Sequence, residues 1–404
     1  MAERGRAELA QKRSELSRSL TVTMAVASGV AVANLYYNQP LLADMARDLH
    51  VGSHSIGLVA TATQIGYAVG MPVFIPLGDF IERRSLVVSL FVAVGGVLAG
   101  VALSHSLASL VATSFLVGLT TIIAQILIPF ATELASPAER GKTIGTIMTG
   151  VLLGILLART VSGVVAQHLG WRAMYWIAAA GAGTFALLLR FALPRIPAPR
   201  GVRYADLMRS IWQIMREEGK LLQVSATAGL IFASFSAFWT TLVFHLGVPP
   251  LHYGAQAAGL FGLVGAVGAG VAPWAGRLSD SRSPRFVVKL SLAIVLSAFL
   301  LFWSAGNSIW GLIIGVIVLD AGVQAAQVAN QTRVLSLRPK ARNRVNTVYM
   351  ISYFTGGSIG SLAGSFAWSR DGWSGVCVAG IGFLVLAVIA LVSRGPAPIT
   401  ITSD

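Results

Sequence analysis

The segment "LGDFIERR", residues 77–84, places acidic and basic side chains directly after an apolar run. A related segment, "LSDSRSPR", residues 278–285, begins 201 residues later. Three more matches occur at nearly the same offset: Gly145-Thr146-Ile147 with Asn346-Thr347-Val348, Gly170-Trp171 with Gly372-Trp373, and Gln125 with Gln327. Self-similarity at one fixed offset is the signature of an internal repeat. The sequence therefore predicts a duplicated unit of about 200 residues.

Apolar runs of membrane-spanning length fill both copies of this unit. The chain is 55% hydrophobic and 11% charged, whereas a soluble domain is about 25% charged. A helix of about 20 apolar residues crosses the hydrocarbon core, and its backbone must be satisfied internally. Twelve such runs are present: 20–42, 54–77, 86–104, 107–133, 143–166, 173–192, 222–246, 255–276, 286–304, 308–332, 344–367 and 373–393.

These runs predict an all-α membrane protein of twelve transmembrane helices in two pseudo-symmetric six-helix bundles. We expect the first bundle over 1–192, a cytoplasmic linker over 193–221 and the second bundle over 222–404. The linker contains three prolines and then an apolar stripe along 204–220. That stripe indicates an amphipathic helix, lying either at the membrane interface or in solvent.

The net charge of +14 follows from the topology rather than from a nucleic-acid partner. Of 30 Lys and Arg residues, the loops predicted outside hold Arg47, Arg172 and Arg370, and almost all others fall in cytoplasmic segments. Basic residues concentrate on the cytoplasmic side of membrane proteins. We expect both termini in the cytoplasm and the lipid bilayer as the partner, with no nucleic acid.

The loop after the second run resembles a motif of the major facilitator superfamily, Gly-x-Leu-x-Asp-Arg-x-Gly-Arg-Arg. Asp79, Arg83 and Arg84 match it, and Asp280 with Arg285 recurs in the second copy. Glu133 and Arg140 also match the family's Glu-x6-Arg. The resemblance covers essentially the whole chain. It implies alternating access, with these seven residues as a cytoplasmic gate whose cross-half pairing exists in one access state. A stop-transfer charge cluster is the alternative.

Polar side chains concentrate in four runs: 20–42, 107–133, 222–246 and 308–332. In a bundle surrounded by lipid, such side chains face protein or water. The resemblance places these four helices around a central cavity. The candidate substrate-cavity residues are Asn34, Tyr37, Asn38, Gln125, Trp239, His245, Gln324 and Gln327. Hydrogen bonding between neighbouring helices is the alternative for each of them.

Glycines at four-residue spacing permit close approach of helices. They occur at Gly66-x3-Gly70, Gly150-x3-Gly154 and Gly356-x3-Gly360-x3-Gly364. The resemblance implies that the helices carrying them form the seam between the two halves. Helix packing of a general kind is the alternative.

Two charged residues lie near the middle of apolar runs: Arg159 in "GILLARTVSGVVA", residues 154–166, and Asp320. Each costs about 2.5–3.5 kcal/mol on insertion scales, so intramembrane charges mark functional sites. We expect Asp320 to bind the coupling proton and Arg159 to compensate its charge; a structural ion pair is the alternative. Arg159 also replaces the last glycine of the family's antiporter motif, and Ile155 replaces its proline.

No nucleophile and base constellation and no metal-ligand spacing is present, so we expect no enzyme, no metal and no cofactor. The expected function is secondary active transport of a small organic solute across a bacterial inner membrane, by a monomer that uses the proton gradient. Resemblance to bacterial drug and sugar exporters favours efflux by proton antiport. Uptake of an anionic solute by proton symport, with Arg159 as its counter-charge, is one alternative. A non-transporting membrane sensor is another.

Overall fold

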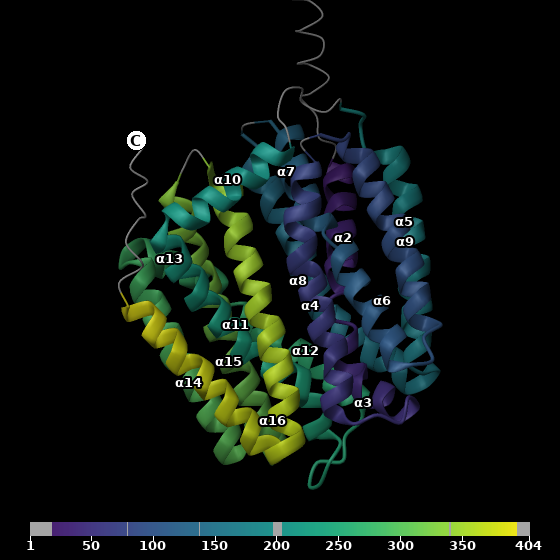
Figure 1. The fold of residues 1–404 in the computed structure, drawn as a ribbon, viewed down its shortest axis with the longest axis vertical. Helices are drawn as coiled ribbons and strands as arrows, with labels where there is room; N and C mark the ends of the chain where they lie inside the picture. Colours follow the sequence, from purple (N-terminus) through teal and green to yellow (C-terminus); the bar gives the residue numbers. More distant parts are fainter. Residues whose placement is uncertain (1–17, 79, 137, 197–203, 339–340, 394–404) are drawn as a thin grey trace, which may run out of the picture.

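The computed structural model describes residues 18–78, 80–136, 138–196, 204–338 and 341–393, and within these ranges it is helical without strands. Figure 1 shows the helices packed side by side as two groups. The first group comprises α2 (Arg18–Ala33), α3 (Asn38–Asp48), α4 (Ser53–Leu77), α5 (Arg83–Ala102), α6 (Leu107–Thr120), α7 (Ile123–Leu134), α8 (Arg140–Leu169) and α9 (Trp171–Ala192). After the linker helix α10 (Tyr204–Glu217) come α11 (Gly219–Leu246), α12 (Ala255–Ala269), α13 (Ala272–Ser281), α14 (Pro284–Ala305), α15 (Ile309–Leu337) and α16 (Arg342–Val392).

Among the described residues, eleven helical stretches are long and apolar enough to cross a membrane. The last of these, 344–392, holds two of the predicted runs. They are divided at Gly372, whose φ of 59° lies where glycine is favoured. The first part runs alongside α11 in the same direction, since Gly356 packs on Gly229 and Gly364 on Ala237. The second part returns to the start of α11, where Gln223 donates to the carbonyl of Leu391. The two parts of α16 therefore run antiparallel, which gives the twelve predicted spans.

Three spans are broken in the middle. The first consists of α2 and α3, the fourth of α6 and α7, and the eighth of α12 and α13. At the second break the Thr121 amide donates to the carbonyls of Val117 and Gly118. By contrast, α11 and α15 run uninterrupted over 28 and 29 residues.

The duplication is visible in the packing of the two groups. Arg84, at the start of α5, donates to the carbonyl of Leu193 at 3.2 Å, and Arg285, at the start of α14, donates to Leu391 at 3.1 Å. The same contact thus joins the third span to the sixth and the ninth span to the twelfth. The two halves therefore pack their corresponding spans in the same way.

The helices that carry the glycine motifs, α4, α8 and α16, do lie at the seam between the halves, as expected. The motif glycines themselves, however, pack within one half. Gly66 and Gly70 pack on α6, and the Gly150 motif packs on α2. The Gly356 motif packs on α11, where a Cβ at Gly360 would overlap the carbonyl oxygen of Ala233. Each motif therefore allows two helices of one half to touch, because small residues serve any close helix pair.

The halves meet at the face opposite α10, where α4 contacts α16 and α8 contacts α12. Gln64 Nε2 donates to Ser361 Oγ at 2.8 Å, and Thr160 Oγ1 donates to the Gly259 carbonyl at 3.0 Å. Along α8, Ala158, Arg159, Ser162, Gly163 and Ala166 are buried near this face, while only Thr143 and Ile147 are buried before them. These contacts between the halves therefore lie towards the face opposite α10.

Candidate functional site

A turn between α2 and α3 delivers two polar side chains to the centre of the molecule. Residues 34–37 leave the helix through short-range bonds, such as Tyr36 N to the Ala33 carbonyl at 3.0 Å. The chain re-enters a helix at Asn38, with Pro40 in its first turn. Proline is tolerated there because the first amides of a helix have no intrahelical acceptor. The turn places Tyr36 and Gln39 beside Arg159.

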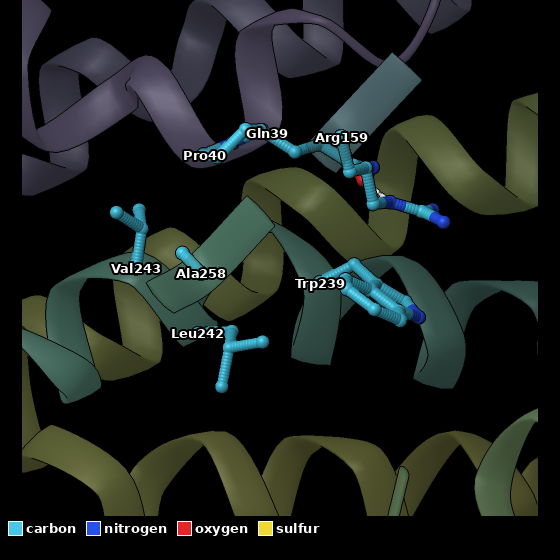
Figure 2. Close-up of a pocket in the computed structure, with 7 residues that line it drawn as sticks. All are labelled: Gln39, Pro40, Arg159, Trp239, Leu242, Val243 and Ala258. Carbon is cyan, nitrogen blue, oxygen red and sulfur yellow. Dashed lines mark hydrogen bonds between the residues drawn. The ribbon is translucent and has the colours of Figure 1, made fainter. Parts of the chain in front are cut away.

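Arg159 is held from several directions on α8 although its side chain is only 1% exposed. Its Nε donates to Gln39 Oε1 at 2.6 Å. Its Cζ lies 3.9 Å from the ring centroid of Trp239, 4.9 Å from that of Tyr36 and 5.9 Å from that of Phe235. Figure 2 shows the guanidinium above the Trp239 ring. Its Nη2 is buried without a hydrogen-bond partner.

Asp320 is the corresponding buried carboxylate, 8% exposed on α15. It packs on α12, where a Cβ at Gly265 would stand 3.1 Å from Oδ1. The Trp239 indole N–H interacts electrostatically with this carboxylate but does not reach hydrogen-bond geometry. Asp320 Oδ2 is buried without a partner. The carboxylate is therefore only partly compensated.

Arg159 and Asp320 attract one another electrostatically but form no ion pair, since none of the ion pairs among the described residues joins them. Helix α12 lies against both residues. Its glycines recur every third position, and each such step turns about 300° around the helix axis. Gly259 and Gly262 consequently meet Arg159, while Gly265 and Gly268 meet Asp320.

A layer of rings lies on the α10 side of Arg159 and Asp320 and joins two of the predicted glutamines. Gln327 follows Asp320 by two turns on α15, and Arg338 at the end of α15 pairs with Glu217 of α10. Gln125 donates to the Tyr67 hydroxyl at 3.3 Å, and the Tyr353 hydroxyl donates to Gln327 at 3.4 Å. The ring of Phe354 lies 4.5 Å from that of Tyr67 and 5.6 Å from that of Tyr353. Gln324, also half-buried, lies one turn after Asp320 on α15.

Four other predicted cavity residues lie in different surroundings. Asn38 donates to Thr63 Oγ1 at 3.0 Å, and Tyr37 is buried and interacts with Tyr175 of α9. Asn34 is buried in the turn after α2. His245 lies at the end of α11, where its Nε2 is 2.9 Å from the Gly306 carbonyl and its ring stacks on Trp373.

The structure thus brings Trp239, but not Tyr37, Asn38 or His245, to Arg159. Sequence reasoning missed Tyr36 and Gln39. Pro40 was the signal that could have found them, because a proline just inside a helix start indicates a break in the first span. A crevice lined by Gln39, Pro40, Arg159, Trp239, Leu242, Val243 and Ala258 marks the place, and it is too narrow in this state to hold a water molecule (Figure 2).

The predicted gate residues interact within their own halves. Arg83 forms an ion pair with Glu133 and donates through Nε to the Gly78 carbonyl. Arg84 and Arg285 make the helix-end contacts given above. Arg140 and Asp280 are exposed and belong to none of the ion pairs among the described residues, and Asp79 lies outside those residues. No cross-half ion pair joins the described gate residues.

Two helical bundles of membrane-crossing length, with buried charges between them, define a multi-pass membrane protein with a site at its centre. The pattern of the Major Facilitator Superfamily matches residues 24–361, and the chain belongs to this superfamily. It is 43% identical over 380 residues to the "Uncharacterized transporter YgaY" of Escherichia coli O157:H7, covering 94% of this chain and 95% of the relative. Identity to the "Probable transporter SCO4007" of Streptomyces coelicolor is 31% over 374 residues, covering 92% of this chain and 86% of that one.

Two solved structures have the same fold. A bacterial homolog of the human lysosomal transporter Spinster, inward-facing and unoccupied, gives a TM-score of 0.73 at 14% identity, covering 94% of this chain and 96% of that one. The nucleoside transporter NupG also gives 0.73 at 14% identity, covering 92% and 97%. The chain is thus a transporter of the major facilitator kind.

Proposed function

We propose that this protein exports a small organic solute across a bacterial inner membrane in exchange for protons. In this proposal the α10 face lies in the cytoplasm, the protein works as a monomer without a cofactor, and the proton gradient supplies the energy. The observation that carries it is Asp320, a carboxylate buried at the centre of the molecule without an ion-pair partner.

The physical argument is a competition at one carboxylate. A buried carboxylate without a partner costs free energy, which either a bound proton or a donor group of the solute removes. When the site is open to the cytoplasm, a solute that reaches Asp320 displaces the proton. When the site is open to the outside, a proton from the acidic side displaces the solute. Each state therefore favours one of the two occupants.

Proton release on solute binding tests this proposal at the binding step itself, independently of the direction of transport. Purified protein in weakly buffered detergent solution, with a pH-sensitive dye, is exposed to a panel of cationic, neutral, zwitterionic and anionic solutes. We expect release of up to about one proton per bound solute. Asp320→Asn should bind without release, whereas Asp371→Asn, at the exposed junction within α16, should behave as wild type. Undiminished release from Asp320→Asn would remove Asp320 from the mechanism.

Symport of an anionic solute is the second candidate, and the unpartnered Nη2 of Arg159 is the observation that favours it. An anion bound there would stabilise the protonated form of Asp320, because the site would otherwise hold two negative charges. The same dye experiment would then show proton uptake instead of release. If the protein is instead a sensor, proteoliposomes with an imposed proton gradient would show neither proton-driven export nor proton-driven uptake of solute.

A further inference from the structure

We infer that the solute is a small zwitterion whose carboxylate binds Arg159 and whose ammonium group binds Asp320. This inference rests on the proposed antiport and names the chemical class of its substrate.

The buried atoms left without partners set the chemistry of the ligand. They are Arg159 Nη2 and Trp239 Nε1, which are donors, and Asp320 Oδ2, which is an acceptor. Their side chains are 1%, 2% and 8% exposed. Each buried group without a hydrogen bond costs about 1–3 kcal/mol. A ligand that satisfies them must therefore carry both acceptors and a donor.

Arg159 is oriented to receive a planar anion. Gln39 holds Nε, and the rings of Trp239 and Tyr36 lie near the guanidinium at 3.9 and 4.9 Å. A guanidinium held in this way presents its terminal nitrogens in a fixed direction. A carboxylate matches that edge through two parallel hydrogen bonds, which a lysine in the same place would not provide.

The spacing of the two charges suits one small molecule. A Cβ at Gly262 would stand 3.0 Å from Arg159 Cβ, and a Cβ at Gly265 would stand 3.1 Å from the Asp320 carboxylate. These glycines are one turn apart, and neighbours on a helix face lie about 5–6 Å apart. The two charges attract one another electrostatically but form no ion pair, so one small ligand can contact both. In this state the crevice is too narrow for a water molecule, so binding requires the helices around it to move apart.

The antiport itself requires the cationic group. A solute displaces a proton from Asp320 only if it stabilises the ionised carboxylate, which an ammonium group does and a simple anion does not. A simple cation, in turn, would leave Arg159 Nη2 unsatisfied and would meet the positive guanidinium. A ligand with both charges leaves the site neutral overall.

The surroundings indicate an apolar side group on this zwitterion. Phe235 lies between Phe232 and Trp239, with ring centroids 5.5 and 6.0 Å away, and Tyr353 stacks on Phe232 at 3.9 Å. Aromatic pairs of this kind contribute about 0.5–1.5 kcal/mol beyond their buried area. An aromatic or branched aliphatic amino acid has the required chemistry.

Three matched probes test this inference: phenylalanine, phenylalaninamide without the carboxylate, and N-acetylphenylalanine without the ammonium group. Binding to the purified wild-type protein is measured by isothermal titration calorimetry, and the leucine series is measured in parallel. We expect the zwitterion of at least one series to bind 10-fold or more tighter than either derivative, which corresponds to about 1.4 kcal/mol.

Two variants assign the contacts. Arg159→Gln should remove the preference for phenylalanine over its amide, and Asp320→Asn should remove the preference over the N-acetyl form. Asp371→Asn, at the exposed junction within α16, should preserve both preferences. Wild-type protein that binds a derivative as tightly as the zwitterion, or that binds no zwitterion of either series at millimolar concentration, would overturn the inference. If the zwitterion inference fails but another class of solute releases protons on binding, the proposed antiport still stands. If a zwitterion binds without releasing protons, the antiport is refuted and the substrate class is not.

Discussion

Replacing Gln64 by leucine should open the face opposite α10. Gln64 on α4 donates to Ser361 at 2.8 Å and accepts from Ser236 at 3.4 Å, so it ties the first half to two helices of the second. Leucine has a similar size but no hydrogen-bonding group. A hydrogen bond contributes about 0.5–1.5 kcal/mol net, and the longer of these two contributes least. The closed state should therefore lose about 1–2 kcal/mol, which shifts the equilibrium about 5- to 30-fold towards the state open at this face.

Cysteine labelling measures that shift. Ser365 on α16 is fully buried against Gly57 of α4, so a cysteine placed there reacts with a maleimide only when the halves separate. The natural Cys377 is replaced by serine in all variants. Gln64→Leu should raise the labelling rate of Ser365→Cys about 5- to 30-fold in detergent micelles. Gln125→Leu is the matched control, because Gln125 donates to Tyr67 of its own half. Equal rates in wild-type and Gln64→Leu backgrounds, or an equal increase with Gln125→Leu, would refute the reasoning.

Three further perturbations test the packing and the charges. Gly360→Ala should lower the free energy of unfolding by about 1–3 kcal/mol, because the added Cβ meets the backbone of α11. Gly382→Ala is the control, since open space surrounds Gly382 and no loss is expected. Thermal unfolding in detergent compares the two variants. Glu133→Gln breaks an ion pair whose carboxylate is half exposed, so we expect a loss of under about 1 kcal/mol that high salt abolishes, and a larger, salt-independent loss would contradict this. The double variant Arg159→Gln, Asp320→Asn should lose less free energy of unfolding than the two single variants lose together, by about 0.5–3 kcal/mol, because each charge compensates the other. Losses that add strictly would show that the two charges are independent.

The fold was predictable from the sequence because the membrane restricts what an apolar run can form. Twenty apolar residues in lipid must be helical, so the spans followed from composition alone. The duplication followed from matches at a fixed offset, and the paired contacts of Arg84 and Arg285 are its structural counterpart. The resemblance to the major facilitator superfamily was confirmed by the family pattern over 24–361.

The site was predictable only in part. Arg159 and Asp320 stood out because a buried charge is costly in an apolar run. Their surroundings could not be predicted, because the turn at residues 34–37 was not expected. A helix continued through these residues would not have brought Tyr36 and Gln39 to Arg159. The helices that carry the glycine motifs were correctly expected at the seam, but the spacing of the glycines did not show that the motifs themselves contact helices of their own half.

The breaks in the spans set where each half can bend. Among the helices that carry the polar stripes, both members from the first half are interrupted, as α2 and α3 and as α6 and α7, whereas α11 and α15 are continuous. Each interruption removes part of the hydrogen-bond ladder that resists bending. An interrupted helix therefore bends more easily than a continuous one. In the second half the break falls instead in the eighth span, between α12 and α13, beside Arg159 and Asp320. Bending at these three breaks would therefore change the shape of the central site from both halves.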